Sequence, residues 1–183
     1  MGRSKRVQRP GERSGGESGR ERRASRARLT FRHAAERTPD LSGAWQPGLR
    51  ALRETDRNRI DSEDTSRIKG SVDVESCLKP RYRDQRQWDY AIGFHPTNLV
   101  TEVVYWVEVH PANPRALDIV REKLASLQSW LGEHAAELRA MDKAFVWISS
   151  GKTTLGDRQR RVLTLLGLRQ VGRFFKIPSE FTI

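Results

Sequence analysis

Apolar and polar residues alternate along three segments of the chain, as they do in half-buried β-strands. These segments span 68–78, 87–94 and 101–109. A fourth segment, 144–148, is continuously apolar, which is typical of a short strand buried on both faces. The pattern predicts a last strand, at the edge of the sheet, over 171–177. Three strands therefore come early and close together, and two more follow after longer connections.

Helical spacing of apolar residues begins after the third strand. Asn113-Pro114 is typical of a helix start, with Asn as the N-cap and Pro as the first helical residue. Further helical pieces are predicted over 133–141 and 157–166, and a short one near Pro47. The apolar stripe of the helix that starts at Asn113 consists of Leu117, Val120, Leu124, Leu127 and Leu131.

The element order αβββαβ, followed by a further α and β, predicts an α/β (α+β) fold with one mixed sheet. The first three strands form a meander, and the helix after them returns the chain so that the fourth strand runs parallel to the third. Helices then cover one or both faces of the sheet. The predicted units are a lead-in with a short helix at 41–66, the α/β domain at 67–178 and a C-terminal tail at 179–183.

Residues 1–40 differ in composition from the rest of the chain. They hold 12 Lys and Arg against 5 Asp and Glu, a net charge of +7 out of +11 for the whole chain. With little to bury, we expect this segment to be a disordered basic tail whose removal leaves the fold unchanged. It could add affinity for nucleic acid or for another acidic partner, be only a solvated tail, or precede the true translation start.

Two further features of the composition exclude whole classes of site and location. Cys77 is the only cysteine, which excludes an internal disulfide and a cysteine-based zinc site. No stretch approaches the roughly 20 apolar residues that span a bilayer, and the start lacks the apolar region of a secretion signal. We expect no membrane association and a cytoplasmic location.

Acidic residues gather on the polar face of the three alternating strands. Because like charges on neighbouring strands repel, the acids require solvent, a bound cation or Lys and Arg partners. Small Ala91 and Gly93 and bulky Trp106 share this face, which favours close packing over a fully wet surface. The face therefore carries either a functional cluster or a salt-bridged surface. Its polar residues are Asp73, Glu75, Asp89, Glu108 and His110.

A second set of candidate residues follows from the parallel pairing of the third and fourth strands. Ligands of open α/β sheets bind at the carboxyl ends of parallel strands. Glu108 and His110 end the third strand, and the loop 149–154 follows the fourth. We expect Lys152 in that loop to lie near them and to contact a phosphate or carboxylate.

Segments 70–73, 88–93 and 105–110 resemble parts of uncharacterised bacterial proteins over about 41–178, a resemblance that implies no activity. The strand order, with Asp89 on the second strand and Glu108-x-His110 on the third, resembles the PD-(D/E)xK nuclease-like fold, also called restriction-endonuclease-like. That family uses its Asp and Glu to bind magnesium, and a lysine two residues after the Glu to polarise water or phosphate. His110 stands in place of that lysine, and no proline precedes Asp89.

Two functions are compatible with these observations. The first is a metal-dependent, nuclease-like hydrolase of phosphodiesters that uses Mg²⁺ or Mn²⁺. Its catalytic residues would be Asp89, Glu108, His110 and Lys152, and its metal ligands would come from Asp73, Glu75, Asp89 and Glu108. The second is a non-catalytic module that binds protein or nucleic acid through exposed Trp45, Trp106 or Trp130.

Overall fold

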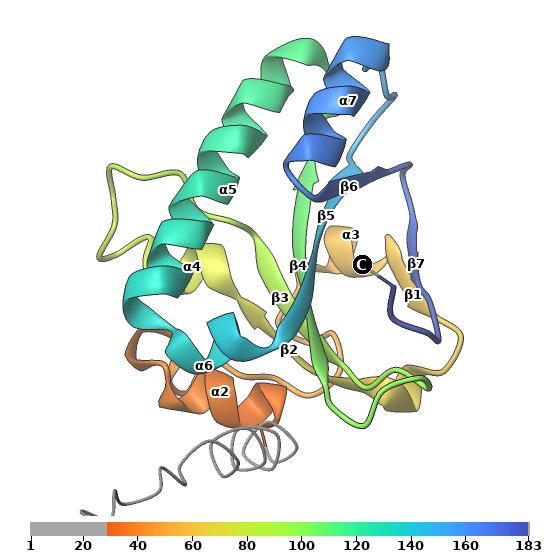
Figure 1. Cartoon of the computed structure of the whole chain (residues 1–183). Coiled ribbons are helices and arrows are strands. Elements are labelled where there is room, and N and C mark those ends of the chain that lie inside the picture. The colour runs from red at the N-terminus through yellow and green to blue at the C-terminus, as the bar shows by residue number, and fades with distance from the viewer. Residues whose placement is uncertain (1–28, 183) are drawn as a thin grey trace, which may run out of the picture.

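The computed structural model describes residues 29–182, and most of the predicted basic tail lies outside them. A five-stranded sheet with the order β2-β3-β4-β5-β6 forms the centre of the protein, and β1 and β7 form a separate two-stranded sheet (Figure 1). The strands are β1 Ile60–Ser62, β2 Ile68–Asp73, β3 Tyr90–Phe94, β4 Val103–His110, β5 Asp142–Ser149, β6 Leu168–Val171 and β7 Phe175–Ile177. The α-helices are α2 Phe31–Arg37, α3 Glu54–Arg57, α4 Val74–Leu78, α5 Pro114–His134, α6 Ala136–Ala140 and α7 Asp157–Leu165. Short 3-10 helices occupy Pro39–Leu41 and Thr65–Arg67.

The mixed character of the predicted sheet is confirmed. Strands β2, β3 and β4 pair antiparallel, and β4, β5 and β6 pair parallel. Helices α5 and α6 connect β4 to β5, which gives the predicted parallel return. Helix α5 starts as predicted, because the Asn113 side chain accepts a hydrogen bond from the Ala116 N–H and Pro114 is the first helical residue. It runs through Gly132 and ends at His134.

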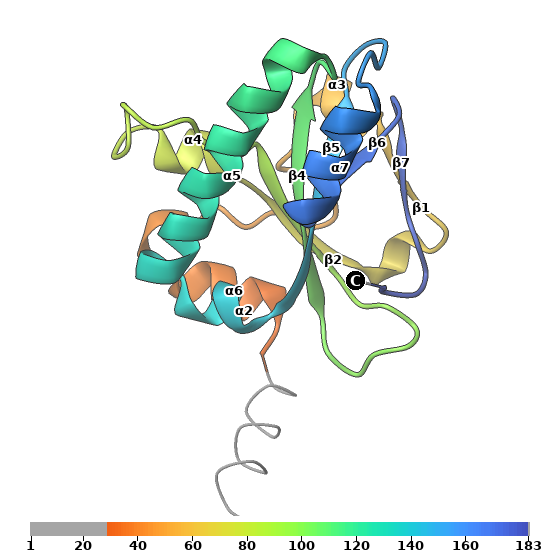
Figure 2. The same cartoon turned by 45° about the horizontal axis from the view of Figure 1, so that its top comes forward.

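Separate hydrophobic clusters cover the two faces of the sheet. On one face, Trp106 and Trp147 pack with the apolar stripe of α5 and with α2. On the other face, Tyr105 packs with the small β1–β7 sheet, including Phe175 and Ile177. Figures 1 and 2 show α5 and α7 on one side of the sheet and α3, β1 and β7 on the other. The polar face inferred from the sequence is therefore a packed interface beneath α5.

The prediction of a disordered tail over residues 1–40 is wrong for its last part, because α2 belongs to the core. Phe31, Ala34 and Ala35 are all fully buried. Phe31 packs directly on Gly93, where an added Cβ would lie 2.4 Å from the Phe31 ring. Glu102, at the start of β4, accepts a hydrogen bond of 2.7 Å from the Phe31 N–H. Averaging the composition over 40 residues concealed a short segment with enough apolar surface to dock.

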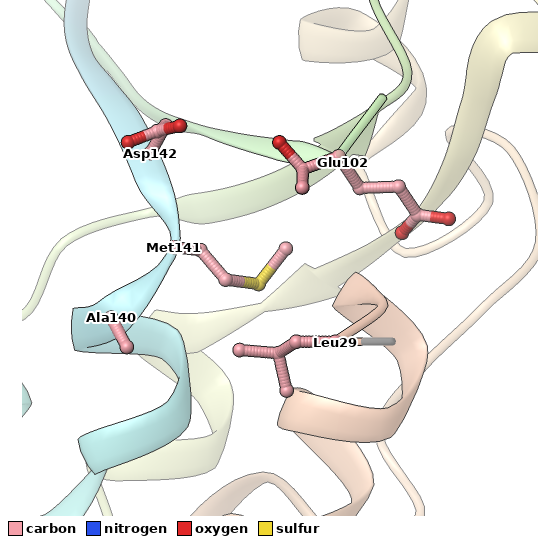
Figure 3. A pocket seen from close by; sticks show the side chains of 6 residues that line it. Leu29, Glu102, Ala140, Met141 and Asp142 are labelled. Atoms are coloured by element: carbon pink, nitrogen blue, oxygen red, sulfur yellow. The ribbon is translucent and has the colours of Figure 1, made fainter. Parts of the chain in front are cut away.

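Figure 3 shows a small pocket where the start of α2 meets the starts of β4 and β5. Leu29 and Met141 line it, with Glu102 beside them. This pocket lies at the end of β4 and β5 opposite to His110 and Ser149. It joins the N-terminal helix to the sheet and is remote from the predicted functional residues.

The predicted first strand, 68–78, stops five residues early. Asp73 becomes the N-cap of α4, since its side chain accepts hydrogen bonds from the backbone N–H and hydroxyl of Ser76. A capping side chain offers the backbone an alternative to the strand ladder, and here it overrides the alternating pattern. Glu75 consequently lies on a helix and not on the sheet.

The other departures concern the edges of the fold. The short helix expected near Pro47 is instead α3, at Glu54–Arg57. The predicted strand 171–177 is two strands, β6 and β7, because the chain leaves the central sheet after Val171 to pair with β1. Residues 29–66 thus contribute to the same packed core as the rest. No helix among residues 29–182 has the length and apolar character needed to cross a membrane.

Candidate functional site

Two carboxylates and one ammonium group meet beneath α5. Lys123 Nζ donates to Asp89 Oδ1 at 2.9 Å and to Glu108 Oε1 at 2.6 Å. The Glu108 side chain is fully buried, and those of Asp89 and Lys123 are 13% and 12% exposed. Asp89 and Glu108 therefore point to the same face of the sheet, as the alternation of the strands implied, and converge on one cation.

Backbone contacts fix Asp89 directly before β3. Its carbonyl oxygen accepts hydrogen bonds from the N–H groups of Val74 and Glu75, at the start of α4. Its side-chain Oδ2 accepts one from the Val109 N–H at 2.8 Å, next to Glu108 on β4. This last contact ties the carboxylate of one strand to the backbone of its neighbour, so the two acids are held in a fixed relation.

Lys123 was not among the residues chosen from the sequence, although a signal for it existed. It lies three residues after Val120 and four before Leu127, within the stripe of α5 that faces the sheet. A lysine in an apolar stripe is an unusual choice, because a buried ammonium group needs a counter-charge. The position of that counter-charge depends on how α5 crosses β4, which local spacing does not reveal.

The pKa values of Glu108 and Lys123 are both raised, but for different reasons. Burial raises the pKa of Glu108 well above its ordinary value, and the nearby Asp89 carboxylate adds to this, while Lys123 opposes it. Burial alone would lower the pKa of Lys123, but the Glu108 and Asp89 carboxylates outweigh it and raise that pKa. The arrangement keeps Lys123 charged and favours a proton, or another cation, on Glu108.

His110 borders this group at the end of β4. Its Nδ1 lies 3.7 Å from Glu108 Oε1, and its side chain is 29% exposed, so it reaches from the buried acids toward solvent. Burial lowers the pKa of His110, and the positive charge of Lys123 lowers it further. The imidazole is therefore a neutral proton acceptor near physiological pH.

The expected meeting of the ends of β4 and β5 is observed in the backbone. Ser150 donates its N–H to the His110 carbonyl at 3.1 Å, and Thr154 donates its N–H to the Ala112 carbonyl at 2.8 Å. Lys152, between these two anchor points, has an exposed side chain. It lies at the predicted end of the sheet, and a phosphate contact by its side chain stays a prediction.

Asp73 and Glu75 do not join the acidic pair. Asp73 caps α4, and Glu75 accepts a hydrogen bond from Arg53 at 3.1 Å. Neither residue has the predicted place beside Asp89 and Glu108, because the chain turns from strand to helix at Val74. Within the described part of the chain, no three or more His, Cys, Asp and Glu side chains are arranged to hold a metal ion.

A divalent ion is nevertheless compatible with the remaining pair. Glu108 Oε2 is buried and receives no hydrogen bond from a donor among residues 29–182. The Lys123 ammonium already occupies the position between the two carboxylates, so a divalent ion that bridged both would displace it. Mg²⁺ is commonly held by one or two carboxylates with water completing its shell, and Asp89 and Glu108 would supply those carboxylates.

Two of the three tryptophans that were expected to be exposed, Trp106 and Trp130, are buried. Trp106 is fully buried and Trp130 is 4% exposed, and their rings pack edge to face at 6.4 Å. Trp45 is half-buried beneath the guanidinium of Arg32 and donates to the Lys69 carbonyl. Of the three tryptophans, only Trp45 therefore keeps part of its surface exposed.

Comparison with known proteins adds no family. No protein-family model, curated protein or solved structure matches this chain.

Proposed function

We propose that the protein is a metal-dependent, nuclease-like hydrolase of phosphodiesters. The observation that carries the proposal is the bridge from Lys123 to Asp89 and Glu108. A buried acid with a perturbed pKa beside a specific charged partner, as Glu108 is beside Lys123, is typical of functional sites. The sheet order and pairing support a restriction-endonuclease-like arrangement, in which these acids stand on the expected neighbouring strands.

Asp89 and Glu108 would hold Mg²⁺ or Mn²⁺. A divalent ion at this site lowers the pKa of bound water and offsets the negative charge that develops on a phosphodiester under attack. The unused Oε2 of Glu108 and its raised pKa favour a cation there. Since a carboxylate must be deprotonated to bind a metal, loading the site should release a proton.

Lys123 and His110 would supply the remaining chemistry. In the resembled family, a lysine two residues after the Glu polarises water or phosphate. Here Lys123 would take that role, and it reaches the acids from α5. Its ammonium can orient a water molecule or a phosphate oxygen. His110 is neutral, partly exposed and next to Glu108, so it can accept a proton from the attacking water.

The test is cleavage by the purified full chain in MnCl₂ or MgCl₂, with single- and double-stranded DNA and RNA as substrates. We expect cleavage that requires the metal and that is lost in Asp89→Asn and Glu108→Gln. Titration with Mn²⁺, followed by calorimetry, should show binding by the wild type with proton release. Both variants should lose most of that binding.

Asp118→Asn is the matched control, because Asp118 is an acid on α5 whose side chain is 73% exposed. It should cleave and bind Mn²⁺ like the wild type. Absence of cleavage on all four substrates would refute the hydrolase. Cleavage that survives in both site variants would show that the activity resides elsewhere.

A further inference from the structure

Beyond the first 40 residues, positive charge is concentrated in one stretch near the end of the chain. Residues 150–176 hold seven Lys and Arg against a single acid, a net charge of +6. Residues 41–149, with four times the length, hold 15 basic against 16 acidic residues, a net charge of −1. The acid in the basic stretch is Asp157, in the first turn of α7. A polyanion approaching the protein would therefore be attracted to this stretch.

Two loops of the basic stretch, after β5 and after β6, lie at the end of the sheet that carries the candidate site. His110 of β4 pairs in register with Ser149 of β5, and the Ser149 N–H donates to the Gly172 carbonyl at 3.0 Å. The loop after β5 and the loop after β6 thus lie at the same end of the sheet as the end of β4, both on its β5 side. Figures 1 and 2 show that α5 and α7 also begin at this end.

Phe174 stands out within this stretch, because its side chain is 72% exposed. Its neighbour Phe175 is buried, as expected for alternation into β7. The backbone around Phe174 is held on both sides. Arg59 Nη1 donates to the Arg173 carbonyl at 3.4 Å, and the Phe175 N–H donates to the Arg59 carbonyl at 2.8 Å. An exposed aromatic ring is therefore presented on an anchored loop beside the exposed Arg173.

We infer that the loop 172–174 binds single-stranded nucleic acid, with Phe174 stacking on a base and Arg173 and Lys152 contacting phosphates; this inference rests on the proposed function. Every base has a π-face, so an aromatic platform in a basic surface binds unpaired strands of any sequence. A duplex conceals those faces within its own stack. The substrate class of the hydrolase is accordingly single-stranded DNA or RNA.

A short single-stranded nucleic acid can span the distance from Phe174 to the candidate site. Neighbouring strands are about 4.8 Å apart and a residue spans about 3.5 Å, so the Phe174 Cα lies at most about 17 Å from that of His110. A few nucleotides cover this distance. The base on Phe174 would then hold the strand while a nearby phosphodiester lies against His110, the partly exposed side of the candidate site.

The experiment measures binding without cleavage. The full chain carrying Glu108→Gln is titrated into fluorescein-labelled, mixed-sequence oligonucleotides, and anisotropy is recorded for single-stranded DNA, single-stranded RNA and a DNA duplex. Wild-type protein in EDTA provides a second series. We expect Phe174→Ala to weaken single-strand binding roughly tenfold, to leave duplex binding nearly unchanged, and to be rescued by Phe174→Trp.

Val100→Ala is the control, since Val100 is an apolar residue 87% exposed in the loop between β3 and β4, at the opposite end of β4 from His110. Equal affinity in Phe174→Ala and Val100→Ala would overturn the inference, and so would an equal loss for single strands and duplex. Phe174-dependent binding without any cleavage by the wild type would leave the platform standing and refute the hydrolase. Cleavage of single strands by Phe174→Ala with the same KM as the wild type would support the hydrolase and refute the platform.

Discussion

Helix α5 supplies hydrogen-bond donors to acids at two places, and the two places differ in how completely the acids are satisfied. Near its C-terminal end, Trp130 Nε1 donates to Asp40 Oδ2 at 2.9 Å. The Tyr82 hydroxyl donates to the same oxygen, and Arg81 donates to Asp40 Oδ1. At the middle of the helix, Lys123 donates to Asp89 and Glu108. Both groups join α5 to other elements, yet their electrostatics are opposite.

At Asp40, the donors satisfy the acid. Burial by itself would raise the pKa of Asp40, but hydrogen bonds from Trp130, Arg81 and Tyr82 lower it. At Glu108, burial and the Asp89 charge raise the pKa, and Oε2 is left without a donor from the described residues. The donors therefore satisfy Asp40, and under the proposed function the open oxygen of Glu108 would receive the metal ion.

The largest expected effect comes from Lys123→Met, which leaves two carboxylates facing each other under α5. Removing one partner of a buried ion pair costs about 3 kcal/mol of unfolding free energy. Urea unfolding at pH 8 should show this loss, and a smaller loss at pH 5, where Glu108 takes up a proton. Adding Glu108→Gln to Lys123→Met should recover most of the stability; no recovery would mean that the two charges are not coupled.

The second effect is the loss of the Asp40 carboxylate in Asp40→Ala. Three donors lose their acceptor, of which Trp130 is buried, at a cost of about 2 kcal/mol in unfolding free energy. The pKa of Asp40 is lowered on folding, so its contribution is present above the ordinary aspartate pKa and disappears as the pH falls through the folded value. The difference from wild type should therefore shrink at pH 3. A difference that grew on acidification would contradict the assignment.

The third prediction, for Glu108→Gln, is an increase in unfolding free energy and not a loss. Glu108→Gln keeps the shape of the side chain, leaves Lys123 paired with Asp89, and removes a charge that the folded protein disfavours. Because the folded pKa of Glu108 is raised, its protonated form stabilises the fold at low pH, and this contribution is lost as the pH rises. The variant should gain about 1 kcal/mol at pH 8 and nothing near pH 4. Thermal unfolding at both pH values measures this, and a loss at pH 8 would place Glu108 with Asp40 as a structural acid.

The smallest effect on stability is expected for His110→Gln. The imidazole is partly exposed and stands 3.7 Å from its nearest carboxylate oxygen, so unfolding free energy should change by less than about 0.5 kcal/mol. Hydrolysis should nonetheless fall by at least about 100-fold, the usual contribution of a general base. The acid limb of the wild-type pH–rate profile should lie below the ordinary histidine pKa, since burial lowers the pKa of His110. A variant that keeps this limb would exclude His110 as the base.

Much of the fold follows from the sequence itself. The alternation of apolar residues located the three early strands, and the continuous apolar run located β5. Asn113-Pro114 set the first residue of α5, because the N-cap and the first helical position have strong local preferences. The same period-two spacing placed Asp89 and Glu108 on one face of neighbouring strands. Such features depend on residues close together in the chain.

Only the tertiary structure decided what met those acids. Lys123 reaches Glu108 over 15 residues and Asp89 over 34, and its position depends on the angle at which α5 crosses the sheet. The docking of Phe31 on Gly93 likewise drew α2 into the core from a segment whose composition predicted a tail. Local patterns determine which elements form. The free energy of packing distant elements determines which side chains share a buried site, and here it placed a lysine between two carboxylates.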